Sequence, residues 1–448
     1  MFVKSVFLAL ALSLGAAGYA SAAAYVPVFP LKASANNRYL VDQNNVPFMM
    51  VGDSPQAMIG NLKLSQAKTF IANRHKYGVN ALWINLLCAS YTACHSDATM
   101  YDGVAPFTTP DDMSTPNPVY FDRAAQIVQA AGAKGMVVLL DPAETGSFLS
   151  MLNDNGAAKA FAYGQFLGNR FKDIPNIIWM SGNDFQSWPD DSQNALVRAV
   201  AHGILSTDPN HLHTIELSYL VSASLDSRPW HNLIGLDAVY TYEPTYAKEL
   251  SEYKRNNFKP TFMVEANYEF EHNGGTDGGS TQNLRKQEYW TMLSGTTGQL
   301  YGSQFSWRLD GDWENNLDTI GILQLSYMRK LFQPRKWYEL VPDRAHEVLT
   351  HGYGKFSDTD PIDTDTYATA ARTPDGTLVM AYLPTVRQVT IDMTRLAGPA
   401  KARWYDPTNG TLSLVGGSPF ANTGTHDFTP PATNAAGDGD WVLLLEAN

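Results

Sequence analysis

The sequence predicts an α/β protein made of a (β/α)8 TIM-like barrel followed by a small C-terminal β-sandwich domain. Short apolar runs alternate with longer amphipathic stretches over most of the chain, which is typical of a parallel sheet covered by helices. After residue 342 the helical pattern stops, and short β-type runs between turn residues follow. The 448 residues are enough for one barrel, which needs about 250 residues, and one small domain.

Eight apolar runs are expected to form the barrel strands. They cover residues 48–51, 81–87, 135–140, 176–180, 213–217, 234–242, 261–264 and 298–307. Amphipathic stretches predict helices over residues 65–77, 121–134, 157–171, 191–207, 282–293 and 319–331, and Ser65 is the expected N-cap of the first helix. A doubly wound sheet alternates in the same way. The count of eight, and the lack of Gly-x-Gly-x-x-Gly after the first run, favour the barrel.

The C-terminal part is predicted to be an accessory domain without a catalytic role. Its β-type runs cover residues 366–371, 378–382, 389–391, 402–405, 411–414 and 441–445, with Gly, Pro, Asn and Asp between them. We therefore divide the chain into a catalytic barrel over residues 23–342 and a β-sandwich over residues 343–448. No low-complexity linker separates them, so the two parts are expected to pack together.

Residues 1–22 have the features of a cleaved signal peptide. A cationic start precedes a short apolar run, and Ala20-Ser21-Ala22 forms a small-x-small cleavage site. The predicted location is secreted or periplasmic. No later stretch is apolar enough to span a membrane, so no membrane contact is expected after cleavage. Cys88 and Cys94 are expected to form a disulfide in that oxidising compartment, because no further metal ligands stand nearby.

Composition and missing motifs exclude several functions. The net charge of −12 and the lack of a Lys/Arg cluster argue against nucleic acid as a partner. His-Glu-x-x-His, Gly-x-Ser-x-Gly and the P-loop are absent, which argues against a zinc protease, an α/β-hydrolase and a nucleotide-binding enzyme. No cofactor and no metal are expected. The acidic stretch 358–365 lacks EF-hand spacing, so a solvated loop is favoured over a calcium site.

The ends of the predicted strands carry many carboxylates and aromatic residues. In a parallel barrel these ends meet at one rim, where active sites lie. The predicted substrate-binding residues at or near this rim are Asp53, Asn85, Asp141, Asn183, Glu216, Tyr240, Tyr242, Tyr268 and Trp307. Such a rim suits a carbohydrate, whose cleavage needs one carboxylic acid and one carboxylate.

Asp184 and Glu265 are the candidate catalytic pair. Each directly follows an apolar run, on predicted strands 4 and 7, which face each other across a barrel. A single carboxylate at a strand end is more often structural, but a facing pair favours catalysis. Glu269 and Glu271 remain alternative nucleophiles.

Five segments together resemble the apiosidase-like glycoside hydrolase family. They are residues 47–54 (PFMMVGDS), 118–121 (PVYF), 178–184 (IWMSGND), 285–290 (RKQEYW) and 301–307 (YGSQFSW). The C-terminal part resembles the β-domain attached to that family, which is sometimes labelled collagen-binding. The resemblance implies a (β/α)8 glycosidase with Asp184 as acid/base and Glu265 as nucleophile.

These roles make specific demands on the surroundings of the pair. Asp184 needs a raised pKa, for which burial near Trp179 or Trp188 is expected. Glu265 needs hydrogen-bond donors, for which Asn183, Tyr240 and Tyr242 are the candidates. A non-catalytic carbohydrate-binding protein on the same barrel is the alternative function. The sugar, the linkage and the oligomeric state stay open.

Overall fold

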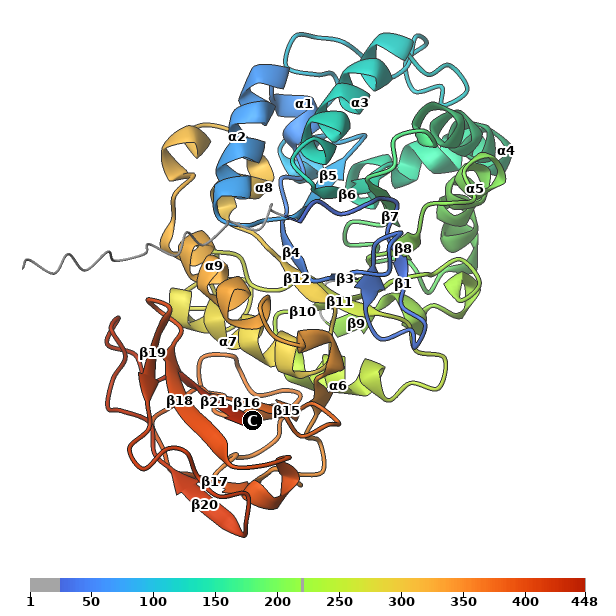
Figure 1. Cartoon of the computed structure of the whole chain (residues 1–448). Helices are drawn as coiled ribbons and strands as arrows, with labels where there is room; N and C mark the ends of the chain where they lie inside the picture. The colour runs from blue at the N-terminus through green and yellow to red at the C-terminus, as the bar shows by residue number, and fades with distance from the viewer. Residues whose placement is uncertain (1–24, 219–220, 448) are drawn as a thin grey trace, which may run out of the picture.

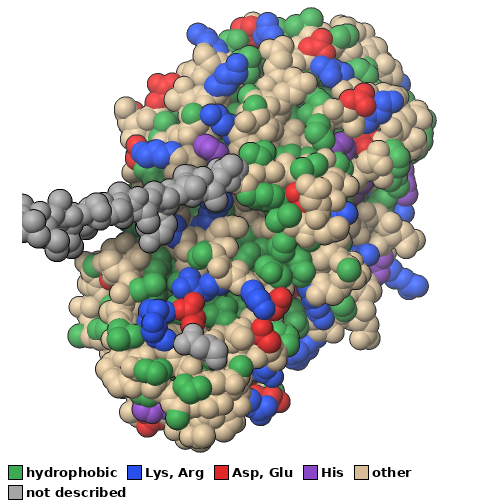
Figure 2. Space-filling view, viewed as in Figure 1, with side chains coloured by type: hydrophobic (Ala, Val, Ile, Leu, Met, Phe, Trp, Pro, Cys, Tyr) green, Lys and Arg blue, Asp and Glu red, His purple; other side chains and the backbone are tan. Residues whose placement is uncertain are grey.

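The computed structural model describes residues 25–218 and 221–447, and Figure 1 shows a barrel with an all-β part below it. The predicted signal peptide and its cleavage site lie outside the described residues. Within them, no helix is both long and apolar enough to cross a lipid bilayer. On the face seen in Figure 2, basic and acidic side chains are interspersed.

Eight parallel strands form the barrel, as the sequence predicts. In chain order they are β4 (Met50–Asp53), β5 (Ala81–Asn85), β6 (Val137–Asp141), β7 (Ile177–Ser181), β8 (His213–Ile215), β10 (Asp237–Thr241), β11 (Thr261–Glu265) and β12 (Gly298–Tyr301). The ring closes where β12 pairs with β4. Among the described residues, β8 is linked to the segment that leads into β10 by a single bridge, from His213 to Ile234, and β9 (Val221–Ala223) pairs antiparallel with β10. The predicted fold class is therefore confirmed.

Helices cover the outside of the strands. They are α1 (Met58–Asn61), α2 (Leu64–Lys76), α3 (Pro118–Gly132), α4 (Thr145–Phe171), α5 (Asp191–Thr207), α6 (Thr245–Tyr253), α7 (Thr281–Leu293), α8 (Gln304–Arg308) and α9 (Ile320–Phe332). Short 3-10 turns are η1 (Ser90–Thr92), η2 (Ser224–Asp226), η3 (Arg228–Trp230), η4 (Trp313–Asn316) and η5 (Trp337–Glu339).

Two details of the prediction are wrong. Residues 304–307 belong to α8 rather than to the eighth strand, because the Ser303 side chain caps a new helix after Tyr301. Ser65 lies inside α2, whose N-cap is Lys63. Helix α4 is interrupted by a kink at Gly156, where φ is 71°, so its second part matches the helix predicted over residues 157–171, and its first part, from Thr145, was not predicted.

Alternation along the strands sorts side chains into an inner and an outer layer. The inner cluster contains Trp83, Leu139, Met180 and Phe262. It also contains Leu31, Leu40 and Phe48, which lie in or next to the short antiparallel strands β1 (Lys32–Ala33), β2 (Leu40–Val41) and β3 (Pro47–Phe48). The neighbouring strand residues pack outward against the helices. Since successive strand residues point to opposite faces, this parity decides which residues at the strand ends reach the barrel mouth.

The C-terminal part consists of two antiparallel sheets. One sheet has the order β13 (Val341–Pro342), β15 (Thr369–Arg372), β16 (Leu378–Leu383), β21 (Trp441–Ala447), β18 (Ala400–Asp406) and β19 (Thr411–Leu414). The other has β14 (Leu349–His351), β17 (Val389–Asp392) and β20 (Thr425–Phe428), and the short turn η6 (Met393–Arg395) follows β17. Both sheets contribute to one buried apolar cluster. All six predicted β-type runs contain a strand; β13, β14 and β20 were not predicted.

Helix α7 joins the barrel to the C-terminal sheets. All of its residues from Asn283 to Leu293 are buried, and the ring of Tyr289 stacks on Tyr382 of β16 at 5.1 Å between centroids. The Arg285 guanidinium, which is fully buried, donates to both carboxylate oxygens of Asp440 at 2.9 and 2.8 Å. The expected packing of the two parts is therefore observed.

The acidic stretch 358–365 also takes part in this contact. The Asp363 carboxylate accepts from the backbone N–H of Thr276 at 2.6 Å and from the Asn283 amide at 2.7 Å. Asp365 is buried and accepts from the Tyr246 hydroxyl at 2.7 Å. The interpretation as a solvated loop is thus wrong for these two carboxylates, which bind donors of the barrel.

We predict that Arg285→Ala lowers the free energy of unfolding by about 3–5 kcal/mol, because it leaves the Asp440 carboxylate buried without its partner. Urea unfolding of the full chain measures this difference. The matched control is Arg123→Ala, which removes the exposed pair with Asp102 and should cost about 0–1 kcal/mol. Equal effects of the two substitutions would contradict the role given to Arg285.

Candidate active site

Three tyrosine hydroxyls converge on the carboxylate of Glu265 at the end of β11. Tyr240 and Tyr242 donate to Oε1 at 2.9 and 2.8 Å, and Tyr268 donates to Oε2 at 2.9 Å. The expected donors Tyr240 and Tyr242 are thus in place, and Tyr268 is a third. Hydrogen bonds of this kind favour the ionised carboxylate.

A register shift in the sheet explains why Glu265 faces the barrel mouth. Phe262 and Val264 of β11 belong to the inner cluster, so simple alternation would turn Glu265 outward. The pairing between β10 and β11 shifts after Val239, and Glu265 comes to lie opposite Tyr240. A bulge of this type re-aims a side chain, as is common beside active sites.

Asp184 lies in a left-handed turn after β7. The three consecutive residues Gly182, Asn183 and Asp184 have φ values of 116°, 62° and 57°. Left-handed φ costs about 1–3 kcal/mol at a non-glycine residue and persists only where surrounding contacts hold it. At Gly182 even a Cβ atom is excluded, since it would lie 2.1 Å from the carbonyl oxygen of Glu216.

Hydrogen bonds hold this strained turn in place. The Thr145 hydroxyl donates to the carbonyl oxygens of Gly182 and Asn183 at 2.8 and 3.1 Å. The backbone N–H of Asp184 donates to Glu216 Oε2 at 3.0 Å. Strain of this kind clusters at functional sites, which adds to the case for Asp184 as a functional residue.

The carboxylates at the ends of β6 and β8 are buried deeper than Asp184. Asp141 and Glu216 are fully buried, and one oxygen of each has no hydrogen-bond partner among the described residues. Burial raises the pKa of both groups, and the charges of Glu265 and Asp184 raise that of Glu216 further. Through its hydrogen bond from the Asp184 backbone N–H, Glu216 helps to hold the turn that carries Asp184.

Asn85 and Asn183 form a buried amide contact beside this turn. The Asn85 amide donates to the Asn183 side-chain oxygen at 2.8 Å and to Glu144 at 3.2 Å. Asn183 therefore contacts Asn85, and the expectation that it donates to Glu265 is wrong. Trp179 points outward, where its indole N–H donates to Asp208 at 2.8 Å. Of the two tryptophans expected near Asp184, Trp179 therefore does not bury it.

Two rim residues that sequence analysis did not single out complete the surroundings of Asp184. The Tyr91 hydroxyl, from η1, donates to Asp184 Oδ2 at 2.7 Å. Glu144 is buried next to this segment and accepts from Ala89 N–H at 2.8 Å. Tyr91 lies in an irregular loop, so the pattern of polar residues at strand ends does not identify it. The sequence feature that points to this loop is the Cys88/Cys94 pair, which is disulfide-bonded as predicted.

Several candidate rim residues have hydrogen-bond partners outside the Glu265 cluster. Asp53 has the outward parity of β4: its carboxylate pairs with Arg74 of α2 and accepts from the Ser306 hydroxyl at 2.9 Å. Trp307 donates to Glu271 at 2.6 Å. Glu269 accepts from the Tyr301 hydroxyl and from Gly321 N–H. Among the three glutamates considered as nucleophile, Glu265 is the one held by the tyrosine cluster.

The two candidate carboxyls influence each other's ionisation. Burial raises the pKa of Glu265 to about 8, together with the negative charge of Asp184, while the three tyrosine hydroxyls act in the opposite direction. Burial also raises the pKa of Asp184, while the hydroxyls of Tyr91 and Tyr240 act in the opposite direction. The pair consequently retains a proton near neutral pH, as two carboxyls with different roles require.

A groove of about 880 Å³ opens beside Tyr91. Its floor and walls come from the loop after β5 and the start of α4, including Phe107, Ser147 and Met151. Its charged lining consists of Asp97, Asp111 and Asp154, and none of the described lining residues is basic. The volume is in the range of ligand-binding clefts.

Family models match both parts of the chain. One described as "Apiosidase-like, catalytic domain" matches residues 34–339, and one described as "Putative collagen-binding domain of a collagenase" matches residues 358–446. No curated protein matches the chain in sequence.

Solved structures show the same fold. A structure described as a glycoside hydrolase is 22% identical, covers 95% of this chain and 98% of its own, and has a TM-score of 0.80. A glycoside hydrolase family 5 structure from Bacteroides vulgatus ATCC 8482 is 21% identical, covers 93% of both chains, and has a TM-score of 0.78. Because the first family model spans well over half of the sequence, the chain belongs to the apiosidase-like family and is a glycoside hydrolase.

Proposed function

We propose that the protein cleaves glycosidic bonds with retention of configuration, with Asp184 as general acid/base and Glu265 as nucleophile. The observation that carries this proposal is the set of three tyrosine hydroxyls on Glu265. They stabilise negative charge on that carboxylate, whereas one tyrosine hydroxyl donates to Asp184. The shared proton of the pair therefore belongs on Asp184.

The first step would form a covalent intermediate. Glu265 attacks the anomeric carbon while Asp184 gives its proton to the glycosidic oxygen, so that the bond to the leaving group breaks as the bond to Glu265 forms. Asp184 is then a carboxylate. It takes a proton from water, which attacks the anomeric carbon and releases Glu265. Glu216, through its contact with the Asp184 backbone, would keep the acid in place during both steps.

The groove beside Tyr91 would take the leaving group. The leaving group carries the oxygen that Asp184 protonates, so it must lie on the acid's side of the pair, where Tyr91 and the groove lie. The lining offers hydroxyls and three aspartates without a basic residue. Such a lining suits an uncharged saccharide and repels uronic acids.

A non-catalytic carbohydrate-binding protein is the competing function for this barrel. A binder would have no need for a strained Asp184 turn or for donors concentrated on one buried carboxylate. Incubation with a panel of polysaccharides distinguishes the two functions. A hydrolase releases products from the polysaccharides, whereas a binder leaves them intact.

We predict that Asp184→Asn and Glu265→Gln each lower kcat/KM by about 10²-fold or more, the range that acid/base groups contribute. Circular dichroism and thermal unfolding should show a folded protein in each case. The matched control is Glu271→Gln at the same rim, which should change kcat/KM by no more than a few-fold. Full activity of either Asp184→Asn or Glu265→Gln would contradict the assignment.

Azide should separate the two roles. With Glu265→Ala it should yield a glycosyl azide of inverted configuration, because azide enters from the vacated face. With Asp184→Ala and a good leaving group it should yield a retained azide, because the covalent intermediate still forms. A retained azide from Glu265→Ala and an inverted azide from Asp184→Ala would instead make Asp184 the nucleophile and Glu265 the acid/base.

The pH dependence follows from the raised pKa values. Activity requires one proton on the pair, and that proton is lost as pH rises through the upper pKa. Since burial raises the pKa of Asp184, the basic limb of kcat/KM should lie above the range of an ordinary aspartate, whose pKa is about 3.9. A basic limb near pH 4 would contradict the raised pKa of the proposed acid.

The groove lining predicts a preference for neutral glycans. In the polysaccharide panel, neutral chains should be cleaved faster than chains rich in uronic acid at low salt. Asp154→Asn, at an exposed groove position, should raise the rate on uronate chains several-fold and leave neutral chains unchanged, because it removes one repelling charge. Asp173→Asn, outside the groove lining, is the control. Faster cleavage of uronate chains by the unaltered enzyme would refute this preference.

A further inference from the structure

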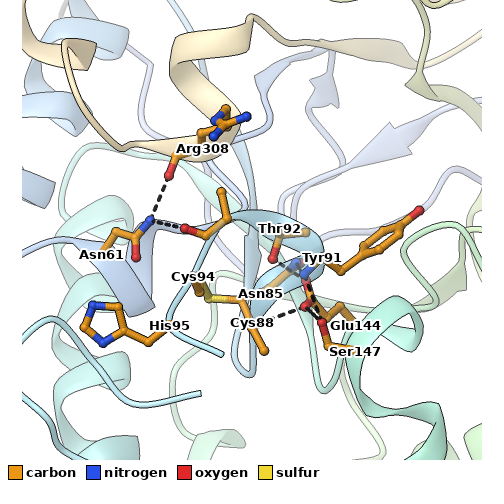
Figure 3. Close-up of a disulfide and its surroundings, with 12 residues drawn as sticks. Asn61, Asn85, Cys88, Tyr91, Thr92, Cys94, His95, Glu144, Ser147 and Arg308 are labelled. Carbon is orange, nitrogen blue, oxygen red and sulfur yellow. Dashed lines mark hydrogen bonds between the residues drawn. A yellow bond between two sulfur atoms is a disulfide. The ribbon is translucent and has the colours of Figure 1, made fainter. Parts of the chain in front are cut away.

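The segment closed by the Cys88–Cys94 disulfide carries Tyr91 to the candidate acid. Figure 3 shows this disulfide with the side chains around it. The Tyr91 hydroxyl donates to Asp184 Oδ2 at 2.7 Å. The other side chains near Asp184 come from barrel strands, whereas Tyr91 comes from a loop whose position needs a separate explanation.

Glu144 anchors this loop from below. It is fully buried and accepts hydrogen bonds from Ala89 N–H at 2.8 Å, Ser147 Oγ at 2.5 Å and the Thr92 hydroxyl. Ser147 Oγ in turn accepts from the backbone N–H of Tyr91 at 3.1 Å. The loop is thereby tied to the start of α4 on both sides of the tyrosine, through backbone before it and the Thr92 side chain after it (Figure 3).

The far end of the loop is held from α1. The Asn61 amide donates to the carbonyl oxygens of Ala93 at 3.1 Å and Arg308 at 2.9 Å. Ala93 has a φ of 61°, a left-handed conformation that such contacts must hold.

Two glycines make room for the ring and the disulfide. A Cβ at Gly146 would lie 2.2 Å from Cγ of the Tyr91 ring, and a Cβ at Gly60 would lie 2.7 Å from each of the two sulfur atoms. The ring and the disulfide therefore pack directly on backbone. One face of the Tyr91 ring thus packs on Gly146, with the hydroxyl on Asp184, although Tyr91 as a whole is 39% exposed.

We propose that Tyr91 is a positioning residue for Asp184, and that the Cys88–Cys94 disulfide holds it there. This inference rests on the proposed role of Asp184 as acid/base. Asp184 gives up a proton in the first step and is then negatively charged. A hydroxyl already aimed at Oδ2 stabilises that charge without reorganisation.

The groups facing Asp184 define what Tyr91 contributes. They are Tyr91 from the loop, Tyr240 and Tyr242 from the β10 end, Glu216 from the β8 end and Glu265 from β11. Burial raises the pKa of Asp184, and the Tyr91 hydrogen bond is the largest effect that lowers it. Loss of this bond should therefore raise the pKa of Asp184.

The test is a ¹³C NMR titration of the full chain with labelled aspartate carboxyls, in which Asp184→Asn identifies the Asp184 signal. In Tyr91→Phe the pKa of Asp184 should rise by about one unit, the usual scale for one lost hydrogen bond to a carboxylate. The matched control is Tyr101→Phe, an exposed tyrosine downstream of the same loop, which should leave it unchanged. An unchanged Asp184 pKa in Tyr91→Phe overturns the proposal.

The role of the disulfide needs its own variants. The double substitution Cys88→Ser/Cys94→Ser should raise the pKa of Asp184 as Tyr91→Phe does, and adding Tyr91→Phe should raise it no further. Gly146→Ala, which displaces the ring without touching the cysteines, should act in the same direction. A normal Asp184 pKa in the folded double variant would exclude the disulfide from this role.

The titration needs no substrate, so the two proposals fail separately. Full hydrolytic activity of Asp184→Asn would remove Asp184 from the proposed chemistry. Conversely, an inactive Asp184→Asn combined with an unshifted Tyr91→Phe titration would remove Tyr91 alone.

Discussion

The rest of the site depends on one constraint: a parallel barrel collects the polar ends of its strands at one buried rim. Carboxylates placed there lose water and must find donors in the protein or keep a proton. Glu265 finds three tyrosine hydroxyls, whereas Glu216 and Asp141 keep oxygens without partners among the described residues. Because hydrogen-bond donors are unevenly distributed, the Glu265 carboxyl is suited to carry a negative charge, whereas the carboxyls of Glu216 and Asp141 are suited to keep a proton.

Parity along each strand decides which residues take part. Asp53 has outward parity and pairs with Arg74 behind the barrel, while the shift between β10 and β11 turns Glu265 inward. The same barrel is fixed from outside by α7, which is buried against the C-terminal sheets through Arg285 and Asp440. The C-terminal part thus stabilises the barrel wall, although every candidate catalytic residue lies in the barrel.

Much of this could be predicted because it follows from periodicity. The eight strands, the six longer helices, the Cys88–Cys94 disulfide and the contact of Tyr240 and Tyr242 with Glu265 all correspond to local patterns or to strand ends. Tyr91 could not be predicted, because the conformation of its loop depends on tertiary contacts with α1 and α4. The outward position of Asp53 was open to prediction, since strict alternation from the inner residue Met50 places it on the other face.

In the proposed mechanism, Glu265 becomes covalently attached to the sugar. The most direct measurement is inactivation by a panel of 2-deoxy-2-fluoro glycosides carrying good leaving groups, followed by peptide mapping of the adduct by mass spectrometry. The proposed mechanism predicts a single glycosyl adduct on Glu265, because the slowed second step traps the intermediate. An adduct on Glu269, Glu271 or Asp184 in the inactivated enzyme would contradict it.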